Sequence, residues 1–118
     1  YLKASANHDK KRLLLQAWHR AQMKALIPDL LTKWEAIIGV KVNQWGIKIM
    51  KTRWGSCNTT KKRIWLNLSL THKPLGCLEY VLVHELVHLL EASHNHRFYA
   101  LMSQFMPDWP VYKALLKE

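Results

Sequence analysis

The chain has 118 residues, of which 49% are hydrophobic and 22% charged, a balance typical of a globular domain rather than a disordered segment. Eighteen Lys and Arg against 8 Asp and Glu give a net charge of +10, which indicates an acidic partner or a solvated basic face. No apolar run reaches the roughly 20 residues of a membrane span, and two cysteines exclude a disulfide scaffold. We expect a single domain over residues 1–118, located in the cytoplasm with no membrane contact.

The charge and the histidines lie in different parts of the chain. Residues 1–73 contain 15 basic and 3 acidic side chains, whereas residues 74–118 contain 3 basic and 5 acidic ones. Four of the 7 histidines, in contrast, fall within residues 84–96. The basic surface and the histidine cluster are therefore separate features of one small protein.

Helical periodicity comes first along the chain. From about Asn7, apolar residues recur at three- and four-residue steps, at Leu14, Trp18, Ala21 and Ala25. Pro28 followed by Asp29 predicts a break and the start of a second helix. Gly39 is a typical helix end, so two successive helices are expected before residue 40.

Two segments with strand-like alternation follow. Residues 47–51 alternate apolar and charged side chains, which predicts a half-buried strand. In residues 64–70 the apolar positions Ile64, Leu66, Leu68 and Leu70 share one face. The connection over residues 52–63 contains Gly55 and suits a long hairpin. A small antiparallel sheet is therefore expected.

The last part of the chain is predicted to be helical again. Pro74 marks the first turn of a helix that runs to about Leu90. Another helix follows His94 and ends before Pro107, and a short one covers residues 111–116. Helices, then two strands, then helices predict an α+β fold.

One motif carries chemistry: His84-Glu85-Leu86-Val87-His88. Two histidines four residues apart on a helix share one face and can bind the same metal ion. Glu85 can lie beside the metal without binding it, hold a metal-bound water and take its proton. The helix is apolar almost all round, and buried imidazoles need partners. The alternative is a pair of core histidines bonded to neighbouring groups.

A catalytic two-histidine site needs a third protein ligand and an open fourth position. The candidates are Glu91, His94, His96 and Asp108. Glu91 would crowd the open position from the same helix face. His94 is far enough along for the chain to leave the helix and turn back. We rank His94 first, then His96, then Asp108.

Several blocks in order resemble the YgjP-like metallopeptidase family, which is akin to the SprT and Spartan-type zinc proteases. The resemblance spans about residues 9–118 and rests on Arg53-Trp54-Gly55-Ser56-Cys57, Ile64-x-Leu66-Asn67-Leu68, Pro74, the segment 78–89, His94 and Phe98-Tyr99. It implies a zincin-like fold, in which the small antiparallel sheet packs with an active-site helix and flanking helices. It also implies that this chain lacks an N-terminal segment that the family carries.

The same resemblance implies a peptidase that binds one Zn²⁺ per chain through His84, His88 and His94, with Glu85 as the catalytic base. Its substrates would be proteins or peptides. Ser93 and Asn95 depart from the family, which usually has Asn before the third histidine and Ser after it. The extra His96 leaves a second candidate for the third ligand.

Two further side chains are weighed for catalysis. Arg53 can stabilise an oxyanion or a substrate carboxylate, or it can bond backbone carbonyls as a structural residue. Tyr99 can supply a hydroxyl to the transition state, although packing is the commoner use. One of the segments 47–51 and 64–70 can present a sheet edge to which an extended substrate adds as a strand.

The basic first part allows a function of another class. Lys10, Lys11 and Arg12, together with Trp18, can bind unpaired nucleic acid, as can residues 61–63 with Trp65. The alternative hypothesis is thus a nucleic-acid-associated module whose zinc is structural or only weakly active. A solvated helix face is the simpler interpretation, and the oligomeric state is left open.

Overall fold

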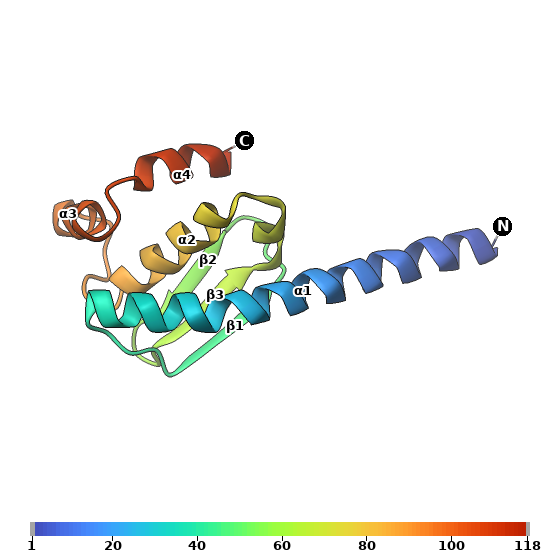
Figure 1. Cartoon of the computed structure of the whole chain (residues 1–118), viewed down its shortest axis with the longest axis horizontal. Coiled ribbons are helices and arrows are strands. Elements are labelled where there is room, and N and C mark those ends of the chain that lie inside the picture. The colour runs from blue at the N-terminus through green and yellow to red at the C-terminus, as the bar shows by residue number, and fades with distance from the viewer. Residues whose placement is uncertain (1, 118) are drawn as a thin grey trace.

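The computed structural model describes the backbone of residues 2–117 and the side chains of residues 9–117. A long helix α1 comes first, then three strands, a 3₁₀ helix and three shorter helices (Figure 1). Their bounds are α1 Leu2–Ile38, β1 Gln44–Lys48, β2 Gly55–Asn58, β3 Arg63–Asn67, η1 Leu68–His72, α2 Leu75–Val87, α3 His96–Phe105 and α4 Trp109–Lys117. The α+β class is confirmed.

α1 is one continuous helix of 37 residues, with Pro28 inside it. The expected break at Pro28 is wrong. The physical reason is a buried stripe on both sides of the proline, formed by Met23, Ile27, Leu31, Trp34 and Ile38. Burial of these side chains outweighs the roughly 3 kcal/mol that a proline costs inside a helix. The helix ends as predicted at Gly39, whose φ of +82° is the left-handed conformation that glycine favours.

The sheet is mixed rather than antiparallel. Its strand order is β1-β3-β2, with β1 parallel and β2 antiparallel to β3. The expected hairpin between the two predicted strands is therefore wrong, because a third strand, β2, lies in the connection and pairs with β3 instead. β1 also begins and ends three residues earlier than the predicted segment 47–51.

β3 and η1 together account for the predicted strand over residues 64–70. All four apolar side chains of its predicted face are buried, but only the first two belong to β3. Asn67 ends the strand, since its side chain accepts a hydrogen bond from the backbone nitrogen of Ser69 and caps the 3₁₀ turn. The regular alternation thus continues through a change of secondary structure.

The three C-terminal helices agree with the sequence. α2 begins after Pro74, α3 follows His94 and ends before Pro107, and α4 lies near the end of the chain. In Figure 1, α4 lies above α2, and the sheet and α1 lie below α2. α2 contacts all three. Two hydrogen bonds join α1 to α2, because Glu79 accepts from Trp34 Nε1 at 2.7 Å and from Lys33 Nζ at 2.9 Å.

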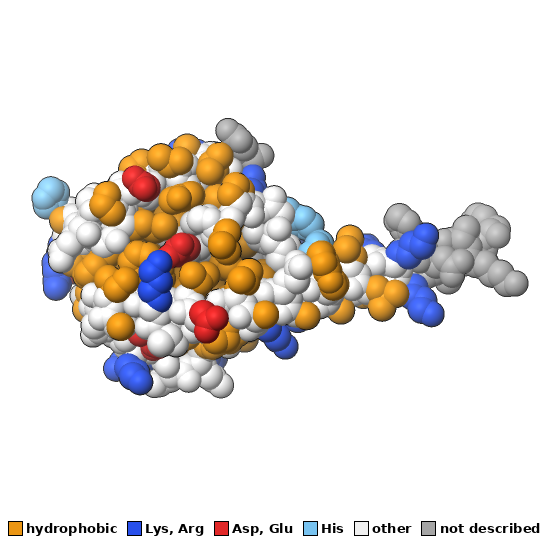
Figure 2. All heavy atoms as spheres, viewed as in Figure 1, with side chains coloured by type: hydrophobic (Ala, Val, Ile, Leu, Met, Phe, Trp, Pro, Cys, Tyr) orange, Lys and Arg blue, Asp and Glu red, His pale blue; other side chains and the backbone are white. Residues whose placement is uncertain are grey.

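The N-terminal half of α1 projects from the rest of the protein (Figures 1 and 2). The longest dimension is 56 Å against 30 and 22 Å for the other two. Leu13, Leu14, Leu15 and Trp18 on this half are all more than half exposed. The periodic positions that predicted the helix are therefore not part of the core. Among residues 2–117, no helix has the length and apolarity to cross a bilayer.

Candidate active site

α2 carries the metal-binding motif in the middle of the protein. Nine of its 13 residues are buried, and the sheet, α1, α3 and α4 surround it. His84 and His88 lie four residues apart on the side that faces the start of α3, with their ring centroids 5.0 Å apart. The spacing therefore places both imidazoles on one face, as the sequence predicts.

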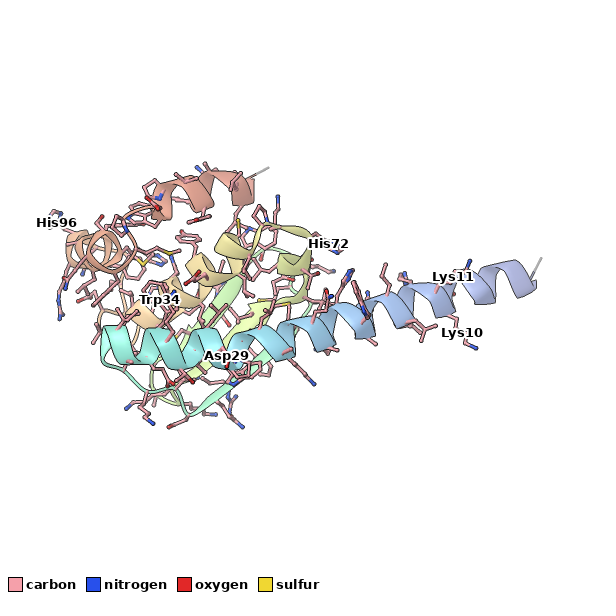
Figure 3. The ribbon with its side chains drawn as sticks, in the orientation of Figure 1. Lys10, Lys11, Asp29, Trp34, His72 and His96 are labelled. Carbon is pink, nitrogen blue, oxygen red and sulfur yellow. The ribbon has the colours of Figure 1, made fainter. Side chains whose placement is uncertain are left out.

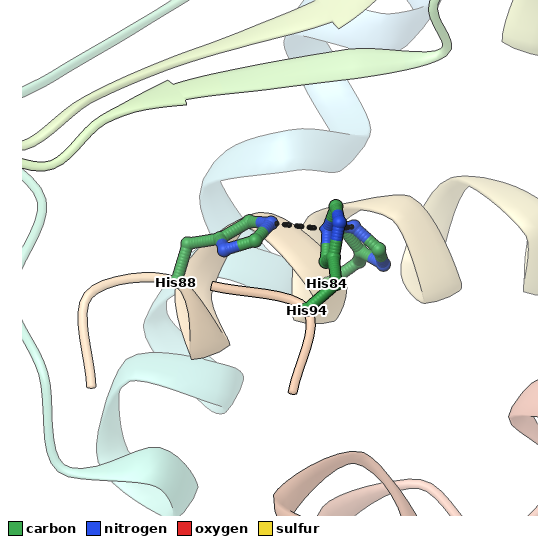
Figure 4. A group of neighbouring side chains, drawn as sticks. All are labelled: His84, His88 and His94. Atoms are coloured by element: carbon green, nitrogen blue, oxygen red, sulfur yellow. Dashed lines mark hydrogen bonds between the residues drawn. The ribbon is translucent and has the colours of Figure 1, made fainter. Parts of the chain in front are cut away.

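His94 completes the group from the loop between α2 and α3 (Figure 4). Its Nε2 lies 2.9 Å from Nε2 of His88 and 3.2 Å from Nε2 of His84. The loop is held by Asn95, whose side chain accepts a hydrogen bond from the backbone nitrogen of Phe98 and caps α3. The chain thus turns back to bring a third imidazole to the pair.

Phe98 supports all three imidazoles. Its side chain is fully buried, and its ring centroid lies 4.9, 4.7 and 4.9 Å from those of His84, His88 and His94. An aromatic ring in contact with all three restricts their rotation. From the sequence, Phe98 entered only as part of the family resemblance, without a role at the site. The available signal was its place four residues before Met102 on the buried face of α3.

Burial favours the neutral form of two of the histidines, His84 and His88. Burial, and then the neighbouring histidines, lower the pKa of His84 to about 3, and burial also lowers the pKa of His88. Nδ1 of His88 lies 3.3 Å from the backbone oxygen of Glu91. This contact favours a proton on Nδ1 and leaves the Nε2 lone pair free for a metal.

These donors fit a zinc ion. Four-coordinate zinc with bonds of 2.0–2.1 Å places its nitrogen ligands about 3.3 Å apart. The described residues form a single group of this kind, His84, His88 and His94, whose ligand atoms all lie within 4.8 Å of one another. Three imidazole nitrogens this close together match a metal site better than a set of core histidines, because converging donor atoms need a shared partner.

Glu85 lies next to the histidines and is only 6% exposed. Burial raises the pKa of its carboxyl group to about 8, and the nearby Arg53 acts in the opposite direction. Gly55 of β2 lets the strand come this close. A Cβ at Gly55 would lie 2.7 Å from Cγ1 of Val81 and 3.1 Å from Oε2 of Glu85. The glycine of the Arg-Trp-Gly-Ser-Cys block therefore makes room for Glu85.

The three histidines and Glu85 line a cleft of about 480 Å³. β2 and the loop before it, with Arg53 and Ser56, form one side, and Lys113 and Lys117 of α4 form the other. The buried Asn67 holds the loop, because its Nδ2 donates to the backbone oxygens of Met50 and Arg53. Arg53 is an exposed residue, and its guanidinium makes no hydrogen bond or ion pair with the described residues.

Tyr80 and Tyr99 occupy different places. The ring of Tyr99 lies 5.5 Å from that of Trp109 and 6.5 Å from that of His94, and Tyr99 is not among the residues that line the cleft. Tyr80 does line it, and its ring lies 5.9 Å from that of His84. Burial raises the pKa of Tyr80 to about 12, so its hydroxyl stays protonated. Tyr80 was not among the predicted site residues, although it precedes His84 by four residues on the same helix face.

The other candidates for the third ligand lie outside the group. His96 is exposed at the start of α3 and points away from the body of the protein (Figure 3). Glu91 binds Asn95 and Arg97 through its carboxylate. Asp108 is an exposed residue beside α4. Of the four candidates, His94 is the one that is brought to His84 and His88.

Both cysteines are free thiols. Cys57 lines the cleft from β2, and burial raises its pKa to about 11, so it is neutral at pH 7. Cys77 is buried in the core. The metal-binding group contains neither of them.

A small α+β domain with a buried His-Glu-x-x-His helix and a third histidine at an open cleft defines a metal-dependent peptidase. The family model described as "YgjP-like, metallopeptidase domain" matches residues 1–118. The chain belongs to this family, and it is accordingly a peptidase. The resemblance noted from the sequence is confirmed. A search of curated proteins finds no match.

Two solved archaeal structures are similar. One is the metallopeptidase zymogen abylysin of Pyrococcus abyssi, with a TM-score of 0.63 and 22% identity over 70% of this chain and 81% of that one. The other is the metallopeptidase zymogen jannalysin of Methanocaldococcus jannaschii, with a TM-score of 0.57 and 25% identity over 68% of this chain and 81% of that one. The first likeness shows the fold, which resembles minimal metallopeptidases.

Proposed function

We propose that this protein is a zinc-dependent peptidase in which His84, His88 and His94 hold Zn²⁺ and Glu85 is the general base. The observation that carries the proposal is the convergence of three imidazole nitrogens at distances of 2.9 and 3.2 Å, with a buried carboxylate beside them in an open cleft. A closed site with four protein ligands would indicate a structural metal instead. The described residues provide three.

Zinc bound at the three imidazoles would act as a Lewis acid and lower the pKa of water, so that a hydroxide nucleophile would be available at neutral pH. Glu85 takes the proton from the attacking water and passes it to the nitrogen of the leaving amine. Its position suits this task, because the carboxyl group is buried beside the histidines and lines the same cleft. Arg53 lines the same cleft, and we assign it the stabilisation of negative charge on the substrate oxygen.

The substrate would add as an extended strand to β2. The two segments considered from the sequence do not serve, because β3 is the central strand and β1 lies at the opposite edge of the sheet. β2 is the edge strand beside the cleft, and Gly55, Ser56 and Cys57 line it. Backbone hydrogen bonds along β2 would hold a peptide with little dependence on its sequence.

Binding to nucleic acid would use a different surface, namely the basic face of α1. Lys10, Lys11 and Arg12 are exposed near Trp18, which is 56% exposed (Figure 3 labels the two lysines). This surface would recruit the peptidase to substrates on nucleic acid. Binding of single-stranded DNA that weakens steeply with salt would support it, and absence of binding at low ionic strength would remove it.

Metal analysis and one substitution test the proposed function. Protein purified without chelators should contain about one zinc per chain, and a value near zero would contradict the metal site. The Glu85→Gln variant should keep its zinc and lose peptide hydrolysis by about 100-fold or more. Hydrolysis at the parent rate would show that Glu85 is not the base.

A further inference from the structure

The cleft is surrounded by positive charge. Arg53 lies on its β2 side, and Lys113 and Lys117 lie on its α4 side. Among the described residues that line it, Glu85 is the only acidic one, and it is buried at the reaction centre. This cationic rim, defined by Arg53, Lys113 and Lys117, adds to the charge that a bound metal ion would bring.

The fold holds α4 in place over the cleft. Gly76 of α2 lies directly under the ring of Tyr112, because a Cβ at Gly76 would come within 2.6 Å of the Tyr112 Cζ. At the other end of α4, Nζ of Lys73 donates a hydrogen bond of 3.1 Å to the backbone oxygen of Leu115. Lys113 and Lys117 are four residues apart, so they extend from the same side of this anchored helix.

Lys113 is further positioned by two aromatic rings. Its Nζ lies 5.9 Å from the ring centroid of Tyr99 and 5.7 Å from that of Trp109. Such contacts orient an ammonium group without neutralising it. Across the cleft, Asn67 fixes the backbone of Arg53 through a hydrogen bond of 2.7 Å. The backbone of Arg53 and the ammonium group of Lys113 are therefore both positioned by neighbouring groups.

None of the three cations forms a salt bridge within the described part of the chain. The salt bridges found there join Arg12 to Asp9, Lys33 to Glu79 and Arg97 to Glu91. Three cations around one buried carboxyl group give the described part of the cleft a positive potential that attracts anionic groups. From this arrangement, and resting on the proposed peptidase function, we propose that the cleft selects substrate segments with Asp or Glu beside the scissile peptide bond.

An acidic peptide fits better than a nucleic acid. The cations surround a peptidase centre, where the bound group must place a peptide carbonyl beside Glu85. Because Arg53 is assigned to the substrate oxygen, Lys113 and Lys117 of α4 are the groups that an acidic side chain beside the scissile bond would reach. The basic face of α1 is a separate surface outside this cleft.

Binding can be measured without turnover in the zinc-loaded Glu85→Gln variant. The probes are three fluorescein-labelled dodecapeptides in which Ala alternates with Glu, Gln or Lys, followed by fluorescence anisotropy. The Glu peptide should bind about tenfold more tightly than the Gln peptide at 50 mM salt and about twofold more tightly at 300 mM salt. Equal binding of the Glu and Gln peptides would overturn the proposal.

Matched variants locate the effect. In the same background, replacing both Lys113 and Lys117 by Gln should reduce the preference for the Glu peptide over the Gln peptide about fivefold. Replacing both by Arg should preserve this preference. Lys10→Gln with Lys24→Gln removes the same charge from α1 and should leave the preference intact. An equal loss in this control would assign the preference to net charge rather than to the cleft, and would overturn the proposal.

Cleavage separates this inference from the function on which it rests. The zinc-loaded parent is incubated with a random dodecapeptide mixture, and cut sites are read by mass spectrometry. Enrichment of Asp and Glu beside the cut bonds supports both ideas. Cleavage without enrichment overturns the acidic preference alone. If nothing is cut but the Glu peptide binds as expected, the peptidase mechanism fails and the selectivity of the cleft stands.

A nucleic-acid arm completes the test. Single-stranded dT12 is added as a competitor of the Glu peptide. Displacement that disappears in the Lys113→Gln, Lys117→Gln variant would make the cleft a nucleic-acid site and overturn the proposal. Displacement that is unchanged by these two substitutions, or no displacement, leaves the acidic peptide as the ligand of the cleft.

Discussion

α1 and α2 are both recognisable as helices in the sequence, yet they play opposite parts in the molecule. α1 has 37 residues and projects from the body, with three consecutive leucines more than half exposed. α2 has 13 residues, of which nine are buried. The difference shows that a helical pattern does not itself determine burial. Burial depends on what other elements are available to cover each face.

The largest expected difference between α1 and α2 is in the free energy of unfolding lost when a leucine is truncated to alanine. Leu82 of α2 is fully buried, so Leu82→Ala should lower the free energy of unfolding by about 2–5 kcal/mol through lost burial and a cavity. Leu14 of α1 is 62% exposed, so Leu14→Ala should change it by less than about 0.5 kcal/mol. Urea denaturation followed by circular dichroism measures both. Similar losses for the two variants would mean that the exposed half of α1 is covered in solution.

Zinc binding by α2 should depend on His94, which lies outside the helix in the loop before α3. His94→Ala removes one of three converging nitrogens and should raise the dissociation constant for zinc by about 100-fold, or roughly 2.7 kcal/mol. His96→Ala is the matched control, because His96 is exposed outside the group. Competition with a chromogenic chelator gives both constants. A larger loss for His96→Ala would reassign the third ligand.

Glu85 should make the stability of the metal-free protein depend on pH. Burial raises its pKa from 4.5 to about 8, so the folded protein keeps a proton that the unfolded chain releases. This contribution to stability is complete below pH 4.5 and is lost as pH rises towards 8. We therefore expect Glu85→Gln to gain about 3–4 kcal/mol relative to the parent between pH 5 and pH 8.

Thermal unfolding in the presence of a chelator measures this difference, since the remaining titrating groups are common to both proteins. Asp29→Asn removes an exposed carboxylate from α1 and should show no such pH dependence. A parent and a Glu85→Gln variant that respond alike to pH would indicate that Glu85 is hydrated in solution.

The smallest effect is expected at Pro28. Pro28→Ala restores a backbone hydrogen-bond donor inside α1 and should stabilise the protein by about 1 kcal/mol, provided that the buried stripe keeps its packing. The midpoint of urea unfolding would rise. A destabilised variant would mean that the proline shapes α1 for its packing on α2, and the contrast between the helices would then be smaller than their exposures suggest.

Local patterns were sufficient for most of the helices but not for the sheet. Pro74, the apolar positions of α2 and Pro107 delimit their helices because caps and periodicity act within one element. Gln44–Lys48 pairs parallel to Arg63–Asn67, and a short strand between them takes the antiparallel place. That topology depends on contacts between distant residues, which local alternation does not report.

For the site, the spacing of His84 and His88 was decisive, and His94 was preferred before the fold was known. Tyr80 and Phe98 were not predicted as parts of the site, because aromatic residues at helical spacing are typical of an ordinary core. Arg53 was singled out through its motif. Its place opposite Lys113 becomes visible only when β2 and α4 are set on the two sides of one cleft.

The sequence by itself determined the chemistry available to this protein, because helical spacing places two imidazoles and a carboxylate on adjoining faces of one helix. It also determined the family and the α+β class. The tertiary structure decided the rest: which histidine joins the pair, how closely Gly55 lets β2 approach Glu85, and where the positive charge gathers. These depend on packing between residues far apart in the chain, and such contacts exist only once the fold brings them together.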